Sequence, residues 1–255
     1  MKDSALRYMK SYPNVKLNIG LNVLRRRADG FHDIETLFVP CCAFHDTLEI
    51  VPSDRLSFIA DVPWSNDLTV QAYGLLKAEF DIPPVEIRLT KGSPVGAGLG
   101  GGSADAAFAL RSLNDLFSLG LDDAALAARA ARLGSDCAFF IYNRPMLGSG
   151  RGEILEPFDV PLEKFEIRVE VPEGVSVSTA EAYRGITPSV PQIRLREALG
   201  RPVEDWKDLV RNDFEDTVFA LHPEIAALKR RLYDEGALYA SMSGSGSSVF
   251  GIFSR

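Results

Sequence analysis

Cysteine and histidine are scarce in this chain of 255 residues, which has only three of each. The cysteines are Cys41, Cys42 and Cys137. Because their number is odd and two are adjacent, we expect no disulfide framework and a reducing, cytoplasmic location. The histidines are His32, His45 and His222. They lie too far apart in the sequence to show the ligand spacing of a zinc site.

Long apolar runs and an excess of basic residues are also missing. No run approaches the ~18 apolar residues of a membrane span, and the N-terminus lacks the apolar core of a signal peptide. We expect residues 1–8 to be a short disordered lead. The formal net charge is −7, whereas nucleic-acid-binding surfaces are normally basic. We therefore expect a soluble protein, with neither a membrane nor a nucleic acid as partner.

Several catalytic motifs are absent as well. The chain has no Gly-Lys dipeptide, which excludes a Walker-type phosphate loop. It has no G-x-S-x-G elbow of a serine hydrolase and no H-R-D or D-F-G of a protein kinase. A dinucleotide fingerprint fits only loosely at Gly98, Gly100 and Ser103. Asp122 and Asp123 lie at the distance of its acidic residue, but they are better explained as helix caps.

The most informative segment that is present is P-V-G-A-G-L-G-G-G-S-A-D-A-A at residues 94–107, with five glycines. It follows a predicted strand at 85–89 and leads into a predicted helix at 103–117. Glycine lets the backbone approach an anion closely, and a helix start adds unpaired N–H groups and a positive dipole end. The segment therefore predicts a phosphate cradle. A plain surface turn, the alternative, needs only one or two such glycines.

Residues 15–23 alternate between apolar and polar side chains, which predicts a half-buried strand. Its polar face carries Lys16, Asn18, Gly20 and Asn22. Asparagine is a poor strand former, so this face indicates a surface that meets a ligand. An ordinary solvent-facing surface remains the alternative.

Asp136 stands alone in a small and apolar segment, G-S-D-C-A-F-F at 134–140. A lone carboxylate in such a position is either a helix N-cap or a functional group. If the ligand is a phosphate compound, its counter-charges must be local because the whole chain is acidic. The candidates are Lys16, Arg25, Arg26, Arg27 and Lys91. The arginine run is equally consistent with a solvated turn.

The remaining pattern predicts an α+β protein. Strands are expected at residues 34–39, 47–51, 56–60, 238–243 and 249–253, with another starting at Phe165. Helices are expected at about 67–80 (capped by Asn66 or Ser65), 123–133, 178–184, 204–220 and 223–235. A hairpin at 145–157 marks a boundary, so we expect one domain at 1–155, with the glycine-rich loop, and a second at 156–255.

Three separated segments resemble the GHMP small-molecule kinases. Residues 94–104 resemble the central motif of that superfamily, while the strand with Lys16 and the loop S-G-S-G-S-S at 243–248 resemble its first and third motifs. The resemblance narrows to the 4-diphosphocytidyl-2-C-methyl-D-erythritol kinase family in five segments. These are V-K-L-N-I-G-L at 15–21, R-A-D-G-F-H at 27–32, G-S-D-C-A-F-F at 134–140, S-T-A-E-A-Y at 178–183 and R-N-D-F-E at 211–215.

This resemblance implies transfer of a phosphoryl group from ATP, with Mg²⁺, to the 2-hydroxyl of a CDP-linked methylerythritol. It implies the two-domain GHMP kinase fold, with an N-terminal domain like ribosomal protein S5 domain 2 and a ferredoxin-like C-terminal domain. The active site is then expected in the cleft between the two domains. A monomer or a homodimer is expected.

The resemblance also implies roles for individual residues. Asp136 resembles the catalytic aspartate and Lys16 its partner. Substrate-binding roles fall on Asn18, Phe31, His32, Thr179 and Tyr183, with Phe31 and Tyr183 enclosing the cytosine unless they are ordinary core aromatics. Asn66 and Lys91 are expected on the adenosine side. The ATP phosphates are expected at Pro94, Val95, Gly96, Ala97, Gly98, Leu99, Gly100, Gly101, Gly102, Ser103 and Ala104. Ser103 is either a ligand of Mg²⁺ or a simple helix cap.

Three other functions compete with this one. The nearest is another GHMP kinase that acts on homoserine, mevalonate or a sugar, and residues 31–32 are the feature that discriminates. The second is a catalytically dead binding module, against which the presence of both Lys16 and Asp136 argues. A Rossmann oxidoreductase is a remote third alternative.

Overall fold

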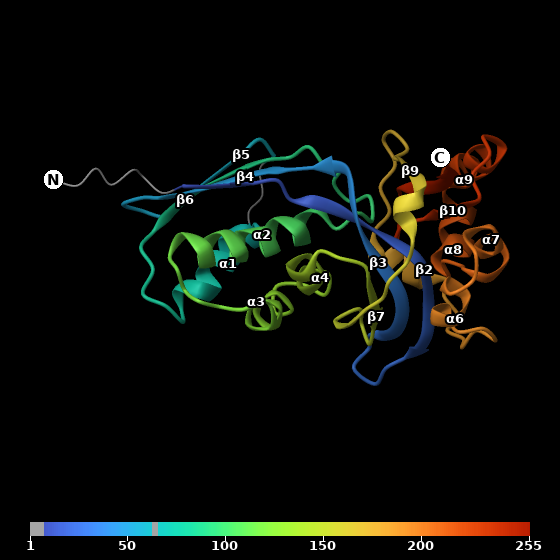
Figure 1. The fold of residues 1–255 in the computed structure, drawn as a ribbon, viewed down its shortest axis with the longest axis horizontal. Helices are drawn as coiled ribbons and strands as arrows, with labels where there is room; N and C mark the ends of the chain where they lie inside the picture. The colour runs from blue at the N-terminus through green and yellow to red at the C-terminus, as the bar shows by residue number, and fades with distance from the viewer. Residues whose placement is uncertain (1–7, 63–65) are drawn as a thin grey trace. The chain divides into compact units, whose positions relative to one another are not determined.

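The computed structural model describes residues 8–62 and 66–255. Residues 1–7 and 63–65 lie outside the described part, and with them most of the predicted lead and the candidate cap Ser65. The chain forms two compact units, each built from several segments (Figure 1). Unit 1 comprises residues 1–15, 44–94 and 100–143, and unit 2 comprises residues 16–43, 95–99 and 144–255.

Unit 1 combines a four-stranded sheet with helices. Its strand order is β1-β4-β6-β5, in which β5 is parallel to β6 and the other pairs are antiparallel. The strands are β1 (Met9–Ser11), β4 (Thr47–Pro52), β5 (Ser57–Ala60) and β6 (Val85–Thr90). The helices are α1 (Leu68–Lys77), α2 (Gly101–Leu116), α3 (Asp123–Ala130) and α4 (Cys137–Tyr142). These helices lie on one side of the sheet (Figure 1), where α2 contacts β1 and β4.

Side-chain caps set where two helices of unit 1 begin. The Asp67 carboxylate accepts the Thr69 N–H at 2.7 Å and caps α1. We expected Asn66 or Ser65 in this role. The Asp122 carboxylate accepts the Ala125 N–H at 2.7 Å and caps α3, as predicted. Replacing such a cap typically costs about 1 kcal/mol.

Unit 2 contains two sheets with strand orders β2-β3-β7-β8 and β10-β11-β9. The strands are β2 (Asn14–Arg26), β3 (His32–His45), β7 (Met146–Ser149), β8 (Ile154–Pro157), β9 (Phe165–Glu170), β10 (Tyr239–Met242) and β11 (Val249–Ser254). The helices are α5 (Thr179–Arg184), α6 (Leu195–Leu199), α7 (Trp206–Leu209), α8 (Phe214–Leu221) and α9 (Pro223–Asp234), with short 3₁₀ turns at Leu162–Lys164 and Val203–Asp205. Leu21 and Val23 of β2 share a buried cluster with Val218 of α8 and Ile225 of α9. Burying each such side chain contributes about 1.5–3 kcal/mol.

Strand β2 confirms the period-two pattern but not the expected half-burial. Lys16, Asn18 and Asn22 are buried together with the apolar residues that alternate with them. The solvent-facing alternative is therefore wrong. Buried polar groups require hydrogen-bond partners, so this face must meet other parts of the protein.

The helix predicted at 204–220 is interrupted. It divides into a 3₁₀ turn, α7 and α8, because the intervening backbone pairs with β2. The Leu21 N–H donates to the Arg211 carbonyl and the Asp213 N–H donates to the Leu21 carbonyl, both at 2.8 Å. Helical periodicity does not reveal such a pairing, because its partner lies about 190 residues away in the sequence.

The compact units are not divided at a single point near residue 155. Strands β2 and β3 contribute residues to both units, and the glycine-rich loop passes from unit 2 to unit 1 between Leu99 and Gly100. The division into domains at 1–155 and 156–255 remains a prediction. The hairpin predicted at 145–157 is confirmed as β7 and β8.

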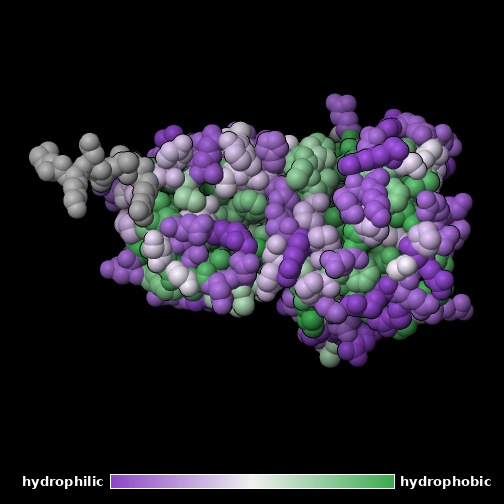
Figure 2. Space-filling model, in the orientation of Figure 1, coloured by the Kyte–Doolittle hydropathy of each residue, from purple (hydrophilic) through white to green (hydrophobic). Residues whose placement is uncertain are grey.

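The face shown in Figure 2 mixes hydrophilic and hydrophobic residues, as is normal for a folded protein whose apolar atoms still contribute to the surface. Among the helices of residues 8–62 and 66–255, none has the length and hydropathy to cross a bilayer. All three cysteines are free thiols, which confirms the expectation that they form no disulfide framework.

Candidate active site

The glycine-rich loop has a backbone that requires glycine at alternate positions. Gly96, Gly98 and Gly100 have φ values of 70°, 75° and 73°, a left-handed region that costs other residues about 1–2 kcal/mol. Backbones with alternating left-handed residues form concavities that bind anions through N–H groups. The conformation therefore supports the predicted phosphate cradle.

In unit 2, residues 95–99 of the loop are held by close packing against the loop at 243–248. The Ser248 N–H donates to the Ala97 carbonyl at 3.1 Å, and the Ser243 hydroxyl donates to the Gly98 carbonyl at 3.2 Å. A Cβ atom at Gly98 would lie 2.2 Å from the Ser243 carbonyl oxygen. Two of the three predicted GHMP motifs thus meet at Gly98.

Lys16 lies beside this contact and is 3% exposed. Its backbone N–H donates to the Leu99 carbonyl at 2.9 Å, and its ammonium group donates to the Gly98 carbonyl at 2.8 Å and to the Asn18 amide oxygen. The Asn18 amide nitrogen donates to the Thr36 hydroxyl at 3.0 Å. Asn18 therefore orients Lys16, and its contact with a substrate remains a prediction.

Asn212 is a buried residue of this site whose role we did not predict. Its amide nitrogen donates to the carbonyls of Met242 and Gly244, both at 2.8 Å, and its amide oxygen accepts the Phe214 N–H at 3.0 Å. A Cβ atom at Gly244 would lie 3.4 Å from the Lys16 ammonium. Asn212 therefore fixes the backbone next to Lys16. The signal in the sequence was the segment R-N-D-F-E at 211–215, which resembles the family but does not by itself reveal these contacts.

In unit 1, the loop leads into α2 without a capping side chain. Gly100 occupies the N-cap position, and no side-chain hydrogen bond caps the helix. The first N–H groups of a helix have no partners within the helix and carry the positive end of its dipole. The start of α2 therefore offers donors to an anion. Ser103 lies in the first turn, so its interpretation as the helix cap is wrong.

Asp136 precedes α4 without capping it. Its φ and ψ are −86° and −13°, and its side chain makes no capping hydrogen bond, so the cap interpretation is wrong. The pKa of the adjacent Cys137 thiol is raised to about 11, chiefly by burial; the hydrogen bond with the Ser103 hydroxyl opposes the rise, and the Asp136 charge contributes to it. A Cβ atom at Gly134 would lie 3.2 Å from the Cys137 sulfur and 3.9 Å from the Ser103 hydroxyl oxygen. The helix starts thus bring Ser103 and Asp136 into one region of unit 1.

Lys91 is not placed as an adenosine contact. Its side chain is 7% exposed, and its ammonium group is enclosed by the carboxylates of Asp46 and Asp105. This pairing argues against Lys91 as a counter-charge for the ligand, and its place on the adenosine side remains a prediction. Asn66 is exposed, and its backbone carbonyl accepts the Gln71 side chain at 3.1 Å. Its adenosine role remains a prediction.

The aromatic residues expected around the cytosine form a different pairing. His32 stacks on Tyr183, with ring centroids 4.6 Å apart and an interplanar angle of 15°. The Phe31 ring is 55% exposed, and the Arg151 guanidinium lies 5.0 Å from its centroid. The sequence indicates Phe31 and Tyr183 as a sandwich, but in this structure His32 covers one face of Tyr183. Phe31 is not an ordinary core aromatic.

Thr179 lies next to the loop at 243–248. It is the first residue of α5, after the capping residue Ser178, and its hydroxyl is 3.4 Å from the Ser245 hydroxyl. This places a predicted substrate-binding residue beside the segment that holds the glycine-rich loop.

The arginine run lies at the β2–β3 turn and is largely neutralised there. Arg25 pairs with Asp33, and Arg27 pairs with Asp29 and Asp33 at 3.0 Å. Hydrogen bonds from both arginines lower the pKa of the Asp33 carboxyl. The solvated-turn alternative therefore fits Arg25 and Arg27 better than a role as ligand counter-charges.

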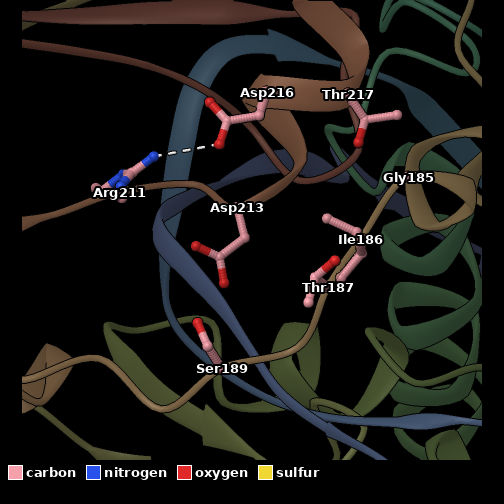
Figure 3. Close-up of a pocket in the computed structure, with 8 residues that line it drawn as sticks. All are labelled: Gly185, Ile186, Thr187, Ser189, Arg211, Asp213, Asp216 and Thr217. Carbon is pink, nitrogen blue, oxygen red and sulfur yellow. Dashed lines mark hydrogen bonds and ion pairs between the residues drawn. The ribbon is translucent and has the colours of Figure 1, made fainter.

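Unit 2 also contains a cavity of about 250 Å³ in which none of the predicted site residues takes part (Figure 3). Its lining residues are Gly185, Ile186, Thr187, Ser189, Arg211, Asp213, Asp216 and Thr217. Arg211 and Asp216 form an ion pair across its rim at 3.3 Å (Figure 3). The Asp213 carboxylate accepts the Val23 N–H at 2.7 Å, so this acidic group serves the β2 pairing.

The part of the chain that the structure describes contains no cluster of three or more His, Cys, Asp or Glu residues able to hold a metal ion. Mg²⁺ in kinases is mostly held by substrate phosphates with only one or two side chains. Ser103, with its hydroxyl in the first turn of α2, fits that limited role.

Comparisons with known proteins identify the family. Residues 67–144 match the family described as GHMP kinases N terminal domain, and residues 195–255 match GHMP kinases C terminal. These two matches cover more than half of the chain. The chain belongs to the GHMP kinases. The predicted GHMP kinase fold is thereby confirmed.

This GHMP kinase is 48% identical to 4-diphosphocytidyl-2-C-methyl-D-erythritol kinase of Parabacteroides distasonis, over 97% of this chain and 92% of the relative. It is 47% identical to the protein of the same name from Bacteroides thetaiotaomicron, over 96% of this chain and 92% of that relative. A crystal structure of 4-(cytidine 5'-diphospho)-2C-methyl-D-erythritol kinase superposes with a TM-score of 0.81 at 34% identity, over 96% of this chain and 90% of that chain. Within the GHMP kinases, the chain therefore belongs to this kinase family.

The GHMP kinase fold alone also matches proteins with other names. A homoserine kinase from Cytophaga hutchinsonii has a TM-score of 0.67 at 21% identity, over 100% of this chain and 88% of that chain. The fold therefore does not discriminate between acceptors.

Proposed function

We propose that this GHMP kinase transfers the γ-phosphoryl group of ATP to the 2-hydroxyl of 4-diphosphocytidyl-2-C-methyl-D-erythritol, a step of the non-mevalonate isoprenoid pathway. The observation that carries the proposal is the 48% identity to a kinase of that name over 97% of the chain. Within the matched length, we propose that residues 31–32 discriminate this acceptor from those of other GHMP kinases. The uncapped start of α2 supplies the anion site that such a donor needs.

The acceptor is a tertiary alcohol, which is hindered and far from ionised at neutral pH. We assign Asp136 as the base that takes the hydroxyl proton while the new O–P bond forms and the bond to the leaving ADP breaks. We propose that the Lys16 ammonium stabilises the negative charge that develops on the transferred phosphoryl group. Because phosphoryl transfer has a loose transition state, positioning and electrostatics contribute more than full deprotonation.

Substrate recognition is proposed for the aromatic cluster of unit 2. The exposed Phe31 ring offers a face for stacking a base, and the next residue, His32, stacks on Tyr183. We propose that Mg²⁺, when bound, is held by the ATP phosphates with help from Ser103 and offsets their negative charge. A cytoplasmic location and a monomeric or homodimeric state are also proposed.

ADP release by the purified protein, with ATP and Mg²⁺, tests the proposed reaction. Rapid release with the cytidyl methylerythritol substrate, and none with homoserine or mevalonate, is the expected result. ADP release with another acceptor alone would be consistent with a GHMP kinase but would contradict the proposed substrate. ATP binding without turnover on any acceptor would favour the dead binding module.

The same assay tests Asp136. Asp136→Asn should fold normally and lose about 10²–10⁴ in kcat, the usual contribution of a positioned acid or base. Asp54→Asn, at an exposed bend of unit 1, is the matched control and should keep the normal rate. A near-normal kcat of Asp136→Asn would show that Asp136 is not the base.

A further inference from the structure

A hydroxyl on strand β3 continues the polar face of β2, and the proposed reaction leaves it without a role. Lys16, Asn18 and Gly20 alternate along β2 and therefore share one face of the strand. Thr36 lies on β3, the neighbour of β2 in the sheet, and is 0% exposed. Its hydroxyl forms hydrogen bonds with both Asn18 and Gly20. We call Lys16, Asn18, Gly20 and Thr36 the threonine network.

The single hydroxyl proton of Thr36 gives the threonine network one direction. Thr36 Oγ1 donates to the Gly20 carbonyl oxygen at 2.5 Å. A carbonyl oxygen can only accept a hydrogen bond, and a threonine hydroxyl has one proton to donate. Towards Asn18, the hydroxyl oxygen can therefore only accept, and the Asn18 amide nitrogen donates to it at 3.0 Å.

This direction decides which end of the Asn18 amide faces Lys16. With its nitrogen bound to Thr36, the amide presents its oxygen to the Lys16 ammonium, and the two form a hydrogen bond. In a reversed amide, an NH₂ group would face the ammonium, and neither of these groups can accept a hydrogen bond. Thr36 therefore acts on Lys16 through Asn18.

The Asn18 oxygen is one of two acceptors that direct the Lys16 ammonium. The other is the carbonyl of Gly98 in the glycine-rich loop, at 2.8 Å. The Phe38 ring, whose centroid is 5.8 Å from the ammonium, attracts the positive charge but fixes the direction of no N–H group. Because an ammonium carries three N–H groups, the two acceptors also determine where the third one points.

The surroundings keep the threonine network in place. Thr36 lies opposite Gly148 of β7, so β3 is paired on both sides within the sheet β2-β3-β7-β8. Gly20 has a φ of 67°, and a Cβ atom there would lie 2.6 Å from Leu195 Cδ1. The three side chains of the network are at most 3% exposed, and hydrogen bonds in such an interior are stronger than in water.

We infer that Thr36 is a positioning residue of the phosphoryl transfer, which orients Lys16 through the Asn18 amide. This inference rests on the proposed role of Lys16 at the transferred phosphoryl group. An ammonium that is already oriented stabilises the developing charge without reorganising during the reaction. Because this charge develops in the transition state, loss of the Thr36 hydroxyl should lower kcat and leave the binding of both substrates nearly unchanged.

Steady-state kinetics with ATP, Mg²⁺ and the cytidyl methylerythritol substrate tests the inference. Thr36→Val keeps the branched shape but has no hydroxyl, and should lower kcat about ten- to a hundredfold while both KM values stay within about threefold of the wild type. Thr36→Ser retains the hydroxyl and should have a near-normal kcat. Thr90→Val, at the exposed end of β6, is the matched control and should keep the wild-type rate.

Three kinetic results would overturn the inference. The first is a near-normal kcat in Thr36→Val. The second is an equal loss of kcat in Thr36→Val and Thr36→Ser, because the loss would then not depend on the hydroxyl. The third is an effect of Thr36→Val confined to KM, because Thr36 would then act on binding and not on the transfer step.

A second measurement covers the case in which Thr36→Val does not fold. Neutron diffraction from crystals of the perdeuterated wild-type protein should place the Thr36 deuteron towards the Gly20 carbonyl and an Asn18 amide deuteron towards Thr36. A Thr36 deuteron that points to Asn18 would mean that the amide is reversed and the inference wrong. Absence of wild-type turnover with the cytidyl substrate would instead contradict the proposed acceptor, and diffraction would still test the direction of the network.

Discussion

The glycine-rich loop is held in two different ways along its length. At its entry, in unit 1, Lys91, Gly92 and Ser93 are fixed by carboxylates, chiefly Asp46. In its middle, in unit 2, Gly98 is fixed by close contact with the Ser243 backbone. Hydrogen bonds to charged carboxylates hold the first region, and close packing holds the second. Substitutions in the two regions should therefore differ in effect: those in the first region should depend on pH, and those in the second on the volume of the new side chain.

The largest effect on the free energy of unfolding is expected from a methyl group at Gly98, where the loop packs against the Ser243 backbone. Gly98→Ala forces a left-handed residue and places Cβ 2.2 Å from a backbone oxygen, so we expect a loss of about 3 kcal/mol or more. Urea denaturation gives the free energy of unfolding. Gly30→Ala has a similar φ of 87° and open space around Cβ, and should cost only the strain of about 1–2 kcal/mol. Equal losses would mean that packing at Gly98 adds nothing.

The charged region should respond to pH. Because the pKa of Asp105 is raised to about 8, the folded protein holds a proton that the unfolded chain has released, and stability falls as pH rises from about 4 to about 8. Asp105→Asn removes this dependence and should be more stable than the wild type at pH 8, by about 5 kcal/mol at most. The difference should shrink towards pH 4. Thermal unfolding at several pH values measures it, and a pH-independent difference would contradict it.

A smaller effect is expected at Ser243. Its hydroxyl accepts the Asn18 N–H at 3.1 Å and donates to the Gly98 carbonyl. Ser243→Ala leaves a buried N–H without this acceptor and should cost about 1–2 kcal/mol with no change between pH 5 and 9. Ser254→Ala, at the exposed end of β11, is the control. A strong pH dependence in Ser243→Ala would break the distinction between the two regions.

The smallest effect on stability is expected at Gly102. It lies in the first turn of α2, and a Cβ atom there would have no neighbour within 4 Å. Gly102→Ala should stabilise the protein by about 0.5–1 kcal/mol yet raise the KM for ATP several-fold, because the methyl group enters the proposed phosphate site. Steady-state kinetics combined with thermal unfolding separates the two results. An unchanged KM would place the phosphates elsewhere.

The sequence predicted those features that depend on neighbouring residues. The glycine-rich loop, the strand at 15–23 and the first helix of the C-terminal region at 178–184 were recognised from local spacing and are confirmed. The prominence of Asp136 was also visible, because a lone carboxylate in an apolar segment is unusual. The structure then excluded its role as a cap through backbone angles, which no sequence pattern reveals.

The features that were missed depend on partners far away in the chain. Lys91 was placed on the adenosine side by its resemblance to a family position, and no sequence pattern reveals its pairing with Asp46, which lies 45 residues before it. The helix predicted at 204–220 is divided because Leu21 pairs with its middle. The signal available for the buried group of Asp46, Lys91 and Asp105 was Asp105, a single carboxylate on an alanine-rich helix.

The contact between Gly98 and Ser243 also has a consequence for synthesis. These residues are 145 positions apart, and a ribosome adds roughly 5–20 residues per second. The middle of the loop therefore waits for many seconds before the segment that packs against it has even been translated. During this interval the loop lacks its packing partner, so its middle can take the observed conformation only after residues 243–248 have emerged.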